Sequence, residues 1–267
     1  MTGRTHLIIG DSHATPGINN RRFEWLGQII VDLKPDVIIN IGDMADMESL
    51  CTYDRGSKGF EGRRYKKDID AVLDAQERMF APLWKLQKKQ ANMRKKQYRP
   101  EFHLTLGNHE NRINRAIEAD AILDGTIGIE DLQYEEFGWN VHKFLIPAAI
   151  DGVHYAHYFV SGVMDRAISG EHPATMLLNK QHMSCTAGHS HLADWSVRRQ
   201  GNEHIMGCVA GCYFEQKMGY VSDNVNDMYW RGLVVKRNVH QGQYDPQFLS
   251  LNTIKHQYMK RKRRVKV

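Results

Sequence analysis

Short apolar runs and one amphipathic helical pattern alternate in the first fifty residues. Residues 5–10 and 37–41 form apolar runs of the length of buried strands, and polar residues follow each run. Between the runs, apolar side chains recur at helical spacing within residues 21–33. This pattern predicts one βαβ unit of a parallel sheet, with polar residues at the carboxyl ends of both strands.

A gap in the apolar pattern separates this unit from the rest of the chain. Residues 52–67 are rich in glycine and charge, so we expect a loop there. Apolar residues at helical spacing then predict a long helix from Asp68 to about Tyr98, ended by Pro100. A second helix is expected from Asn111 to about Leu123. The remaining predicted strands are residues 102–106, 141–146, 153–157, 184–187, 204–208 and 233–237.

The composition is typical of a globular protein. The 267 residues are 42% hydrophobic and 25% charged, which excludes a wholly disordered or fibrous chain. No apolar run approaches the length of a membrane span, so we expect no membrane partner and a cytoplasmic location. The cysteines lack the close pairs of a structural zinc site, and we expect free, buried thiols at Cys51, Cys185, Cys208 and Cys212.

Positive charge concentrates in two segments. The formal net charge is only +5, yet seven Lys and Arg residues fall within residues 255–267. Seven more, with no acidic residue among them, are Lys85, Lys88, Lys89, Arg94, Lys95, Lys96 and Arg99. A solvated helix face is the common explanation of such a run, and contact with a phosphate backbone is the alternative. With no repeat or linker in the chain, we expect a single domain over residues 1–254, a helical basic insertion at about 51–99 and a basic C-terminal tail at 255–267.

Five short clusters of metal-ligand residues follow predicted strands. They are Asp11-Ser12-His13, Gly42-Asp43-Met44-Ala45-Asp46, Gly107-Asn108-His109-Glu110, His157, and Gly188-His189-Ser190-His191. Because strand ends in an α/β sheet converge at one edge, we expect these residues to meet there. Carboxylate, imidazole and amide oxygen together are ligands for borderline divalent cations.

The spacing within the clusters is compatible with two metal ions. Residues two apart at a strand end can project to the same place, so each of the first and last clusters can offer two ligands. Two cations about 3.5 to 4 Å apart need a shared anion, and Asp43 is the candidate. The glycines at positions 42, 107 and 188 are expected to allow sharp turns before the ligands.

In this order, the five clusters resemble the calcineurin-like metallophosphoesterase superfamily, whose pattern is DxH, GDxxD, GNH(D/E), a lone His and GHxH. The resemblance covers residues 5 to about 212 and suggests a bacterial or bacteriophage member. It implies an α/β fold, a four-layer sandwich of two mixed β-sheets flanked by helices. Met47 and Glu48 stand where the serine/threonine protein phosphatases have Arg-Gly, which weakens that particular assignment.

The resemblance also implies roles for the site residues. One metal ion would be held by Asp11, His13, Asp43 and His191, and the second by Asp43, Asn108, His157 and His189. His109 would act on the substrate phosphate as an acid or charge stabiliser, and Asp46 would orient it. Asn108 and Arg112 are the candidate substrate-binding residues, although Arg112 has the alternative of capping or pairing within its own helix. His157 is preferred to His154 as the lone histidine because it follows the apolar stretch.

The implied activity is metal-assisted hydrolysis of a phosphoester. Manganese is the expected ion, with Fe, Zn, Co, Ni or Mg as alternatives. The two basic segments favour a phosphodiesterase or nuclease acting on nucleic acid or nucleotides. The alternatives are a phosphomonoesterase for small molecules or phosphoproteins, and a binding module that has lost catalysis. The chain has no G-x-S-x-G elbow and no P-loop, which disfavours a serine hydrolase or a nucleotide-driven motor.

Overall fold

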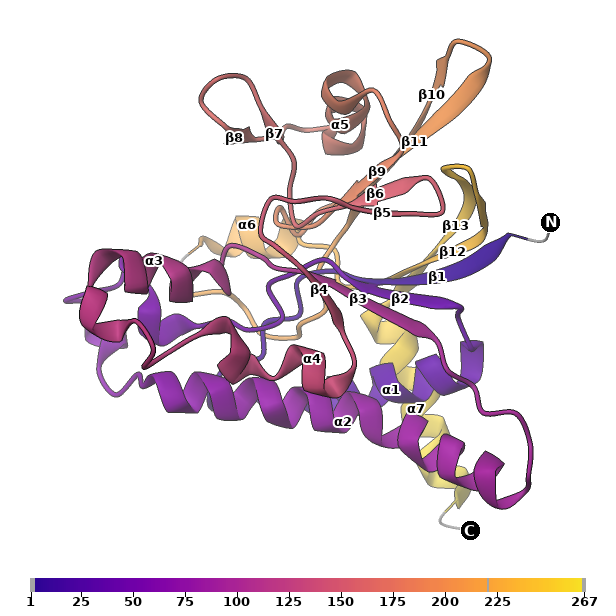
Figure 1. The fold of residues 1–267 in the computed structure, drawn as a ribbon, viewed down its shortest axis with the longest axis horizontal. Helices are drawn as coiled ribbons and strands as arrows, with labels where there is room; N and C mark the ends of the chain where they lie inside the picture. Colours follow the sequence, from indigo (N-terminus) through magenta and orange to yellow (C-terminus); the bar gives the residue numbers. More distant parts are fainter. Residues whose placement is uncertain (1–2, 220, 266–267) are drawn as a thin grey trace.

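Two mixed β-sheets pack face to face between layers of helices (Figure 1). The computed structural model describes residues 3–219 and 221–265, with side chains described as far as Tyr258. The first sheet has the strand order β13-β12-β1-β2-β3-β4. Its members are β1 (Arg4–Ile9), β2 (Val37–Asn40), β3 (Glu101–Thr105), β4 (Asn140–His142), β12 (Gly232–His240) and β13 (Gln243–Ser250). Strands β1 to β4 are parallel, and β12 and β13 are antiparallel additions on the other side of β1.

The second sheet has the order β10-β11-β9-β6-β5. Its members are β5 (Ala148–Ile150), β6 (Val153–Tyr155), β9 (Cys185–Ala187), β10 (Ala193–Gln200) and β11 (Glu203–Ala210). The central strands β6, β9 and β11 are parallel, whereas the edge strands β5 and β10 run antiparallel to their neighbours. A small hairpin of β7 (Val160–Ser161) and β8 (Arg166–Ala167) extends from this sheet.

Helices cover the outer faces of both sheets. Helices α1 (Arg21–Leu33), α2 (Tyr65–Asn92) and α7 (Leu251–Val265) lie under the first sheet, and α5 (Pro173–Gln181) lies on the second (Figure 1). The shorter helices are α3 (Asn111–Ala119), α4 (Tyr134–Phe137), α6 (Asp223–Met228), η1 (Glu48–Leu50), η2 (Lys58–Phe60), η3 (Ala121–Leu123) and η4 (Ile129–Leu132). The predicted four-layer α/β sandwich is therefore confirmed.

The alternation of side chains along β1 explains the layering. Leu7 and Ile9 point into the core shared with α1 and α2, while Ile8 between them points toward the second sheet. Strand β12 repeats the pattern, with Val234 facing the second sheet and both of its neighbours facing the helices. Central strands that are covered on both faces are apolar throughout. For this reason the two strands within the first fifty residues could be predicted from the sequence.

Helix α2 ends earlier than its sequence predicts. The prediction of a helix to about Tyr98 is wrong, because Met93 caps the helix and Arg94 takes a left-handed conformation with φ of 53°. The chain then folds back along the helix, where the backbone of Tyr98 exchanges hydrogen bonds with the side chains of Gln87 and Gln90. Two glutamines of the last one and a half turns of the helix thus hold the returning chain, and the helix ends well before Pro100.

Other differences concern elements with weak apolar patterns. Helices α5 and α6 and strands β5, β7, β8, β10 and β13 have no counterpart among the predicted elements, and β4 ends at His142 although its predicted strand continued to residue 146. The helix expected to reach Leu123 ends at Ala119 and is followed by the separate turn η3. The predicted basic tail continues as helix α7, and its Lys and Arg side chains at 260–266 lie outside the described side chains. The four cysteines are free and buried as predicted. Among the described residues, no helix has the length and apolarity needed to cross a membrane.

Candidate metal centre

The ends of strands from both sheets meet at one edge of the sandwich. Asp11, Asp43 and Asn108 follow the parallel strands β1, β2 and β3. The loops are joined to each other, since the backbone N–H groups of Ser12 and His13 donate to the carbonyl of Asp43 at 3.1 and 2.9 Å. From the second sheet, His157 follows β6, and the loop carrying the last two histidines follows β9.

Four of the candidate ligands have left-handed backbone conformations. The φ angles are 40° at His13, 51° at Asp43, 66° at His189 and 60° at His191. Such angles are unfavourable for residues with a side chain and concentrate at functional sites, where the surrounding structure enforces them. The loops are therefore folded to aim these side chains at the edge, at a local energetic cost.

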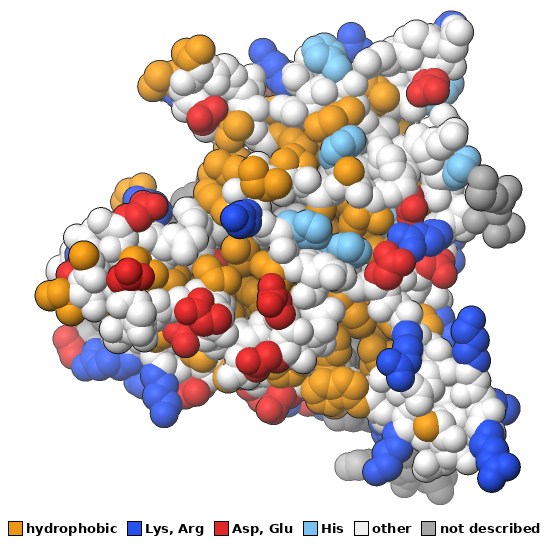
Figure 2. Space-filling model, in the orientation of Figure 1, with side chains coloured by type: hydrophobic (Ala, Val, Ile, Leu, Met, Phe, Trp, Pro, Cys, Tyr) orange, Lys and Arg blue, Asp and Glu red, His pale blue; other side chains and the backbone are white. Residues whose placement is uncertain are grey.

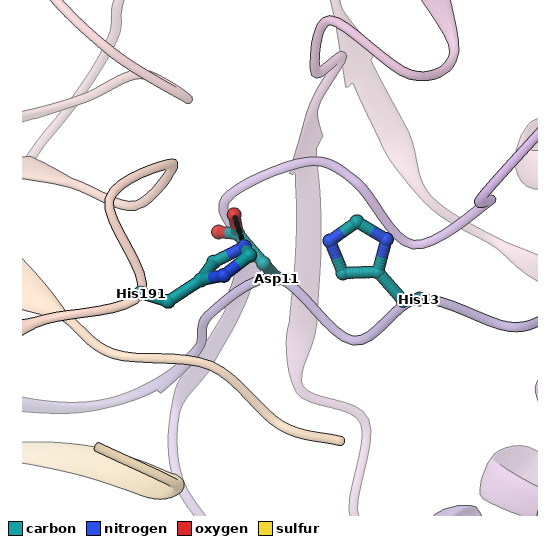
Figure 3. A group of neighbouring side chains, drawn as sticks. All are labelled: Asp11, His13 and His191. Atoms are coloured by element: carbon teal, nitrogen blue, oxygen red, sulfur yellow. Dashed lines mark ion pairs between the residues drawn. The ribbon is translucent and has the colours of Figure 1, made fainter. Parts of the chain in front are cut away.

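A first group of ligand atoms joins Asp11, His13 and His191. One ligand atom of each lies within 4.8 Å of the others, and all three residues are buried. Figure 3 shows the two histidines approaching Asp11 from different loops, with His191 Nε2 lying 3.0 Å from Asp11 Oδ2. His13 Nε2 is buried and has no hydrogen-bond partner among the described residues. A buried imidazole nitrogen without a partner is what an absent ligand would leave.

A second group joins Asp43, His157 and His189 beside it. His157 Nε2 lies 3.2 Å from Asp43 Oδ2, 3.2 Å from His189 Nδ1 and 2.9 Å from Asn108 Oδ1. Its other nitrogen, Nδ1, lies 2.8 Å from the carbonyl of Ile41, which orients Nε2 toward the group. Burial opposes protonation of His157, but the nearby carboxylates of Asp43 and Asp11 raise its pKa to about 10. His154 is not part of either group.

A third group places His109 against Asp46. Oδ1 of Asp46 lies 2.9 Å from His109 Nδ1 and 3.0 Å from His13 Nδ1, so one carboxylate contacts two histidines. Although burial opposes protonation of His109, the carboxylates of Asp43 and Asp46 raise its pKa. Arg112 donates to the backbone carbonyl of Asp46 at 2.8 Å, and its other terminal nitrogen lies 3.3 Å from His109 Nε2.

Residues 5–196 match the family model described as calcineurin-like phosphoesterase, which covers more than half of the chain. The chain belongs to the calcineurin-like phosphoesterase family. It is therefore a metal-dependent phosphoester hydrolase. Among solved structures, the crystal structure of TT1561 of Thermus thermophilus is similar, with 10% identity, 92% of this chain and 99% of that chain covered, and a TM-score of 0.33. None of the curated proteins compared with the phosphoesterase matches it.

The donor set of the phosphoesterase fits divalent cations. Two His/Asp groups lie side by side, with all members buried except the exposed His189, and His13 offers a free nitrogen to the first group. Carboxylate and imidazole together suit ions of the manganese-to-zinc range. The groups suggest a centre for two ions, as the family does.

Two of the three motif glycines serve a different purpose from the expected one. Gly42 has a φ of 84°, so it is a turn glycine as predicted. Gly107 and Gly188 lack a positive φ, and a side chain at either position would collide with the carboxylate of Asp43 or Asp11 respectively. The chain turns directly after both glycines, since the N–H of Asn111 donates to the carbonyl of Gly107 and that of Ser190 to the carbonyl of Gly188, but these two glycines are needed to leave room for the carboxylates.

Glu110 is a site residue for which the sequence analysis assigned no role. Its carboxylate is fully buried and accepts the backbone N–H groups of Asp43, Ala45 and Gly107 at 3.0, 2.9 and 2.9 Å. The hydroxyl of Tyr134 donates to it at 3.1 Å. In the sequence, only the position of Glu110 within the third cluster indicates that it belongs to the site. Nothing in the sequence indicates Tyr134, which lies 24 residues further along the chain.

An open pocket of about 730 Å³ lies in front of the two groups. The segment between β2 and α2 lines it with Tyr53, Asp54 and Arg63, so this part of the predicted insertion borders the site. The seven exposed cations near the C-terminal end of α2 lie elsewhere, at the far end of that helix and away from the pocket (Figures 1 and 2).

Proposed function

We propose that the protein hydrolyses phosphodiesters with two bound divalent cations, of which manganese is the expected one. Asp11, His13, Asp43 and His191 would hold the first ion, and Asp43, Asn108, His157 and His189 the second. Two cations at such a site neutralise phosphoryl oxygens and lower the pKa of water to near neutrality. The adjacency of the two His/Asp groups supports this assignment.

His109 is suited to protonate the leaving oxygen. Its Nδ1 is occupied by Asp46, and the residue lines the pocket, so Nε2, which lies 3.3 Å from a terminal nitrogen of Arg112, is the nitrogen that would face a substrate. The carboxylates of Asp43 and Asp46 raise the pKa of His109 against the effect of burial, which favours the protonated imidazole that a general acid requires. Arg112, beside His109, is placed to contact the phosphate once substrate is bound.

The charge balance at the pocket favours a diester over a monoester. Arg63 is paired with Asp54 at 2.6 Å and with Glu48 at 3.6 Å, and Lys217 is paired with Asp223 at 2.8 Å. These pairs leave Arg112 as the one Lys or Arg of the described pocket lining without an ion-pair partner, so the rim offers one free positive charge and none for a second phosphate charge. A phosphodiester carries one negative charge, whereas a phosphomonoester carries about two at neutral pH. The pairing of the rim cations is the single observation that carries the diester assignment.

A nucleic-acid substrate would have to be long to use both the pocket and the basic residues. Helix α2 has 28 residues and is therefore about 42 Å long. Its first residues adjoin the segment that borders the pocket, whereas the cations lie at its other end. A nuclease acting through these cations would prefer strands that span roughly this length over dinucleotides. A phosphodiesterase for nucleotides would not need the basic residues at the far end of α2.

The proposal is tested by comparing bis(p-nitrophenyl) phosphate with p-nitrophenyl phosphate at the same Mn²⁺ concentration. We expect metal-dependent turnover of the diester that exceeds turnover of the monoester, with both lost in Asp43→Asn. Turnover of the monoester alone would replace the proposal with a phosphomonoesterase. Adding dinucleotides and single strands of increasing length would then separate a nucleotide diesterase from a nuclease.

A further inference from the structure

The guanidinium of Arg22 is buried directly behind the first group of candidate ligands. Arg22 lies in the first turn of α1 and is 1% exposed. No salt bridge to it occurs among the residues that the structure describes. A buried cation without a carboxylate is costly unless its donors are satisfied, so its hydrogen bonds indicate its purpose.

The hydrogen bonds of this guanidinium to the described residues all go to backbone carbonyls. Nη2 donates to Ser12 at 2.6 Å and to His13 at 2.8 Å. Nε donates to Tyr213 at 3.0 Å, and Nη1 donates to Asn19 at 3.2 Å. Only the planar, multiply donating guanidinium can reach carbonyls in these different directions at once.

These carbonyls belong to two segments that together shape the first ligand group. One is the loop after β1, which carries Asp11 and His13. The other follows β11, where the N–H of Tyr213 donates to the carbonyl of Asp11 at 2.7 Å. Its next residue, Phe214, packs edge-on against His13 at 5.3 Å and His191 at 5.1 Å between ring centroids. Arg22 therefore ties the ligand loop to the segment that supports two ligand rings.

The ligand loop needs such support because its backbone is unfavourable. His13 has a φ of 40°, which a histidine does not adopt without compensation. The N–H groups of Ser12 and His13 are held by the carbonyl of Asp43, and their carbonyls are held by Arg22. The ligand loop is thus held by hydrogen bonds on both sides. On one side the donor is a side chain from another element, Arg22 of α1.

We propose that Arg22 is a positioning residue for the first metal ion, holding the loop so that Asp11 and His13 face the same point. It acts through the backbone and contacts neither substrate nor metal. The proposal rests on the proposed two-ion centre and is independent of the substrate. The second ion depends on it only indirectly, because the ligand loop reaches that ion's proposed ligands through the N–H of His189, which donates to Asp11, and through the carbonyl of Asp43.

The test measures Mn²⁺ affinity of the metal-stripped full chain by calorimetry, one ion at a time. A His189→Ala background weakens the second ion and reports the first, and a His13→Ala background reports the second. We expect Arg22→Met to weaken Mn²⁺ binding by about 10- to 100-fold in the first background, as loss of a residue that orients ligands does, and by several-fold less than that in the second. Arg21→Met, at the neighbouring and partly exposed arginine, is the matched control and should change neither affinity.

Thermal unfolding of the metal-free variants checks that each variant is folded. The comparison of Mn²⁺ affinity between the two backgrounds then distinguishes positioning of the first ion from general support of the fold. Equal loss of affinity in both backgrounds, or no loss in the first, would overturn the proposal. If Arg22→Met does not fold, Arg22→Lys keeps the charge but cannot reach all the carbonyls, and the same one-sided loss is expected from it. If the parent chain binds fewer than two ions, the two-ion centre itself fails, and the assignment of Arg22 falls with it.

Discussion

The carboxylate of Glu110 accepts the backbone N–H of Asp43 at 3.0 Å, so a buried acid supports the proposed bridging ligand from behind. The same carboxylate accepts two further N–H groups and the hydroxyl of Tyr134. Burial and the negative charge of Asp43 raise the pKa of Glu110. Two acids are therefore placed close together, and the hydrogen bonds from three backbone groups make this arrangement tolerable.

Glu110→Ala should destabilise the fold strongly. It leaves three buried N–H groups without acceptors, and each costs about 1–3 kcal/mol, so we expect a loss of several kcal/mol in the free energy of unfolding. Tyr134→Phe removes one donor and should cost about 1 kcal/mol. Urea denaturation measures both, with Glu118→Ala on the exposed side of α3 as the control. A loss for Glu110→Ala no larger than that of the control would contradict the bracing role.

His109→Ala should separate catalysis from metal binding. The imidazole contacts Asp46 and lines the pocket, but it is not among the proposed ligands. We expect turnover of the diester to fall by about 10²- to 10⁴-fold, the usual contribution of a general acid. The number of Mn²⁺ ions bound, measured by elemental analysis, should remain that of the parent. Loss of an ion in this variant would mean that His109 is a ligand.

Removing the acids at the pocket rim should shift the substrate preference. In Glu48→Gln with Asp54→Asn, Arg63 loses both of its ion-pair partners and becomes free to meet a second phosphate charge. We expect KM for p-nitrophenyl phosphate to fall several-fold, while KM for the bis(p-nitrophenyl) diester changes little. Asp165→Asn, in the distant β7–β8 hairpin, serves as the control. An equal effect on both substrates would show that rim charge does not discriminate between them.

Lys236 should make the stability depend on pH in the alkaline range. Its ammonium is fully buried between the sheets, next to the hydroxyl of Thr186 and over the rings of Tyr155 and Tyr244 at 4.8 and 4.1 Å. Burial lowers its pKa from 10.5 to about 8. Between these values the unfolded chain binds more protons than the folded one, so the free energy of unfolding rises with pH across this window.

A comparison with Lys236→Met isolates this contribution. The parent should gain up to about 3 kcal/mol relative to the variant between pH 8 and 10.5, since each pKa unit is worth about 1.4 kcal/mol. Urea denaturation at pH 7 and at pH 10.5 measures the difference, with exposed Lys180→Met as the control. A difference between parent and variant that stays constant with pH would show that Lys236 titrates alike in both states.

The cations at the far end of α2 should matter only for long anionic substrates. The triple variant Lys85→Gln, Lys88→Gln and Lys89→Gln removes charge from the exposed end of the helix without touching the pocket. If these residues contact nucleic acid, binding of a long strand should weaken and the slope of log affinity against log salt should decrease by about 2 to 3. Turnover of the small diester should be unchanged. Unaltered binding of the strand would assign these lysines to a solvated helix face.

The sequence by itself determined the first strands of the parallel sheet and the residues that meet at its edge, while the layers of the fold were implied by the family resemblance. Continuous apolar runs such as the one ending at Ile9 identify strands covered on both faces, and the polar clusters directly follow such strands. Both signals are local, because each lies within about ten residues of the element that it concerns. The order of the five clusters then indicated the family, since each cluster is short but the combination is specific.

Only the tertiary structure decided what holds that edge in shape. Arg22 grips carbonyls near residue 12 and at residue 213, and Tyr134 reaches Glu110 from another helix. Gly107 and Gly188 are required by carboxylates that approach them from other loops. Helix α2 ends where the chain can fold back on it, and its cations thereby lie away from the pocket. Each of these features depends on contacts between distant segments, which no local pattern of side chains records.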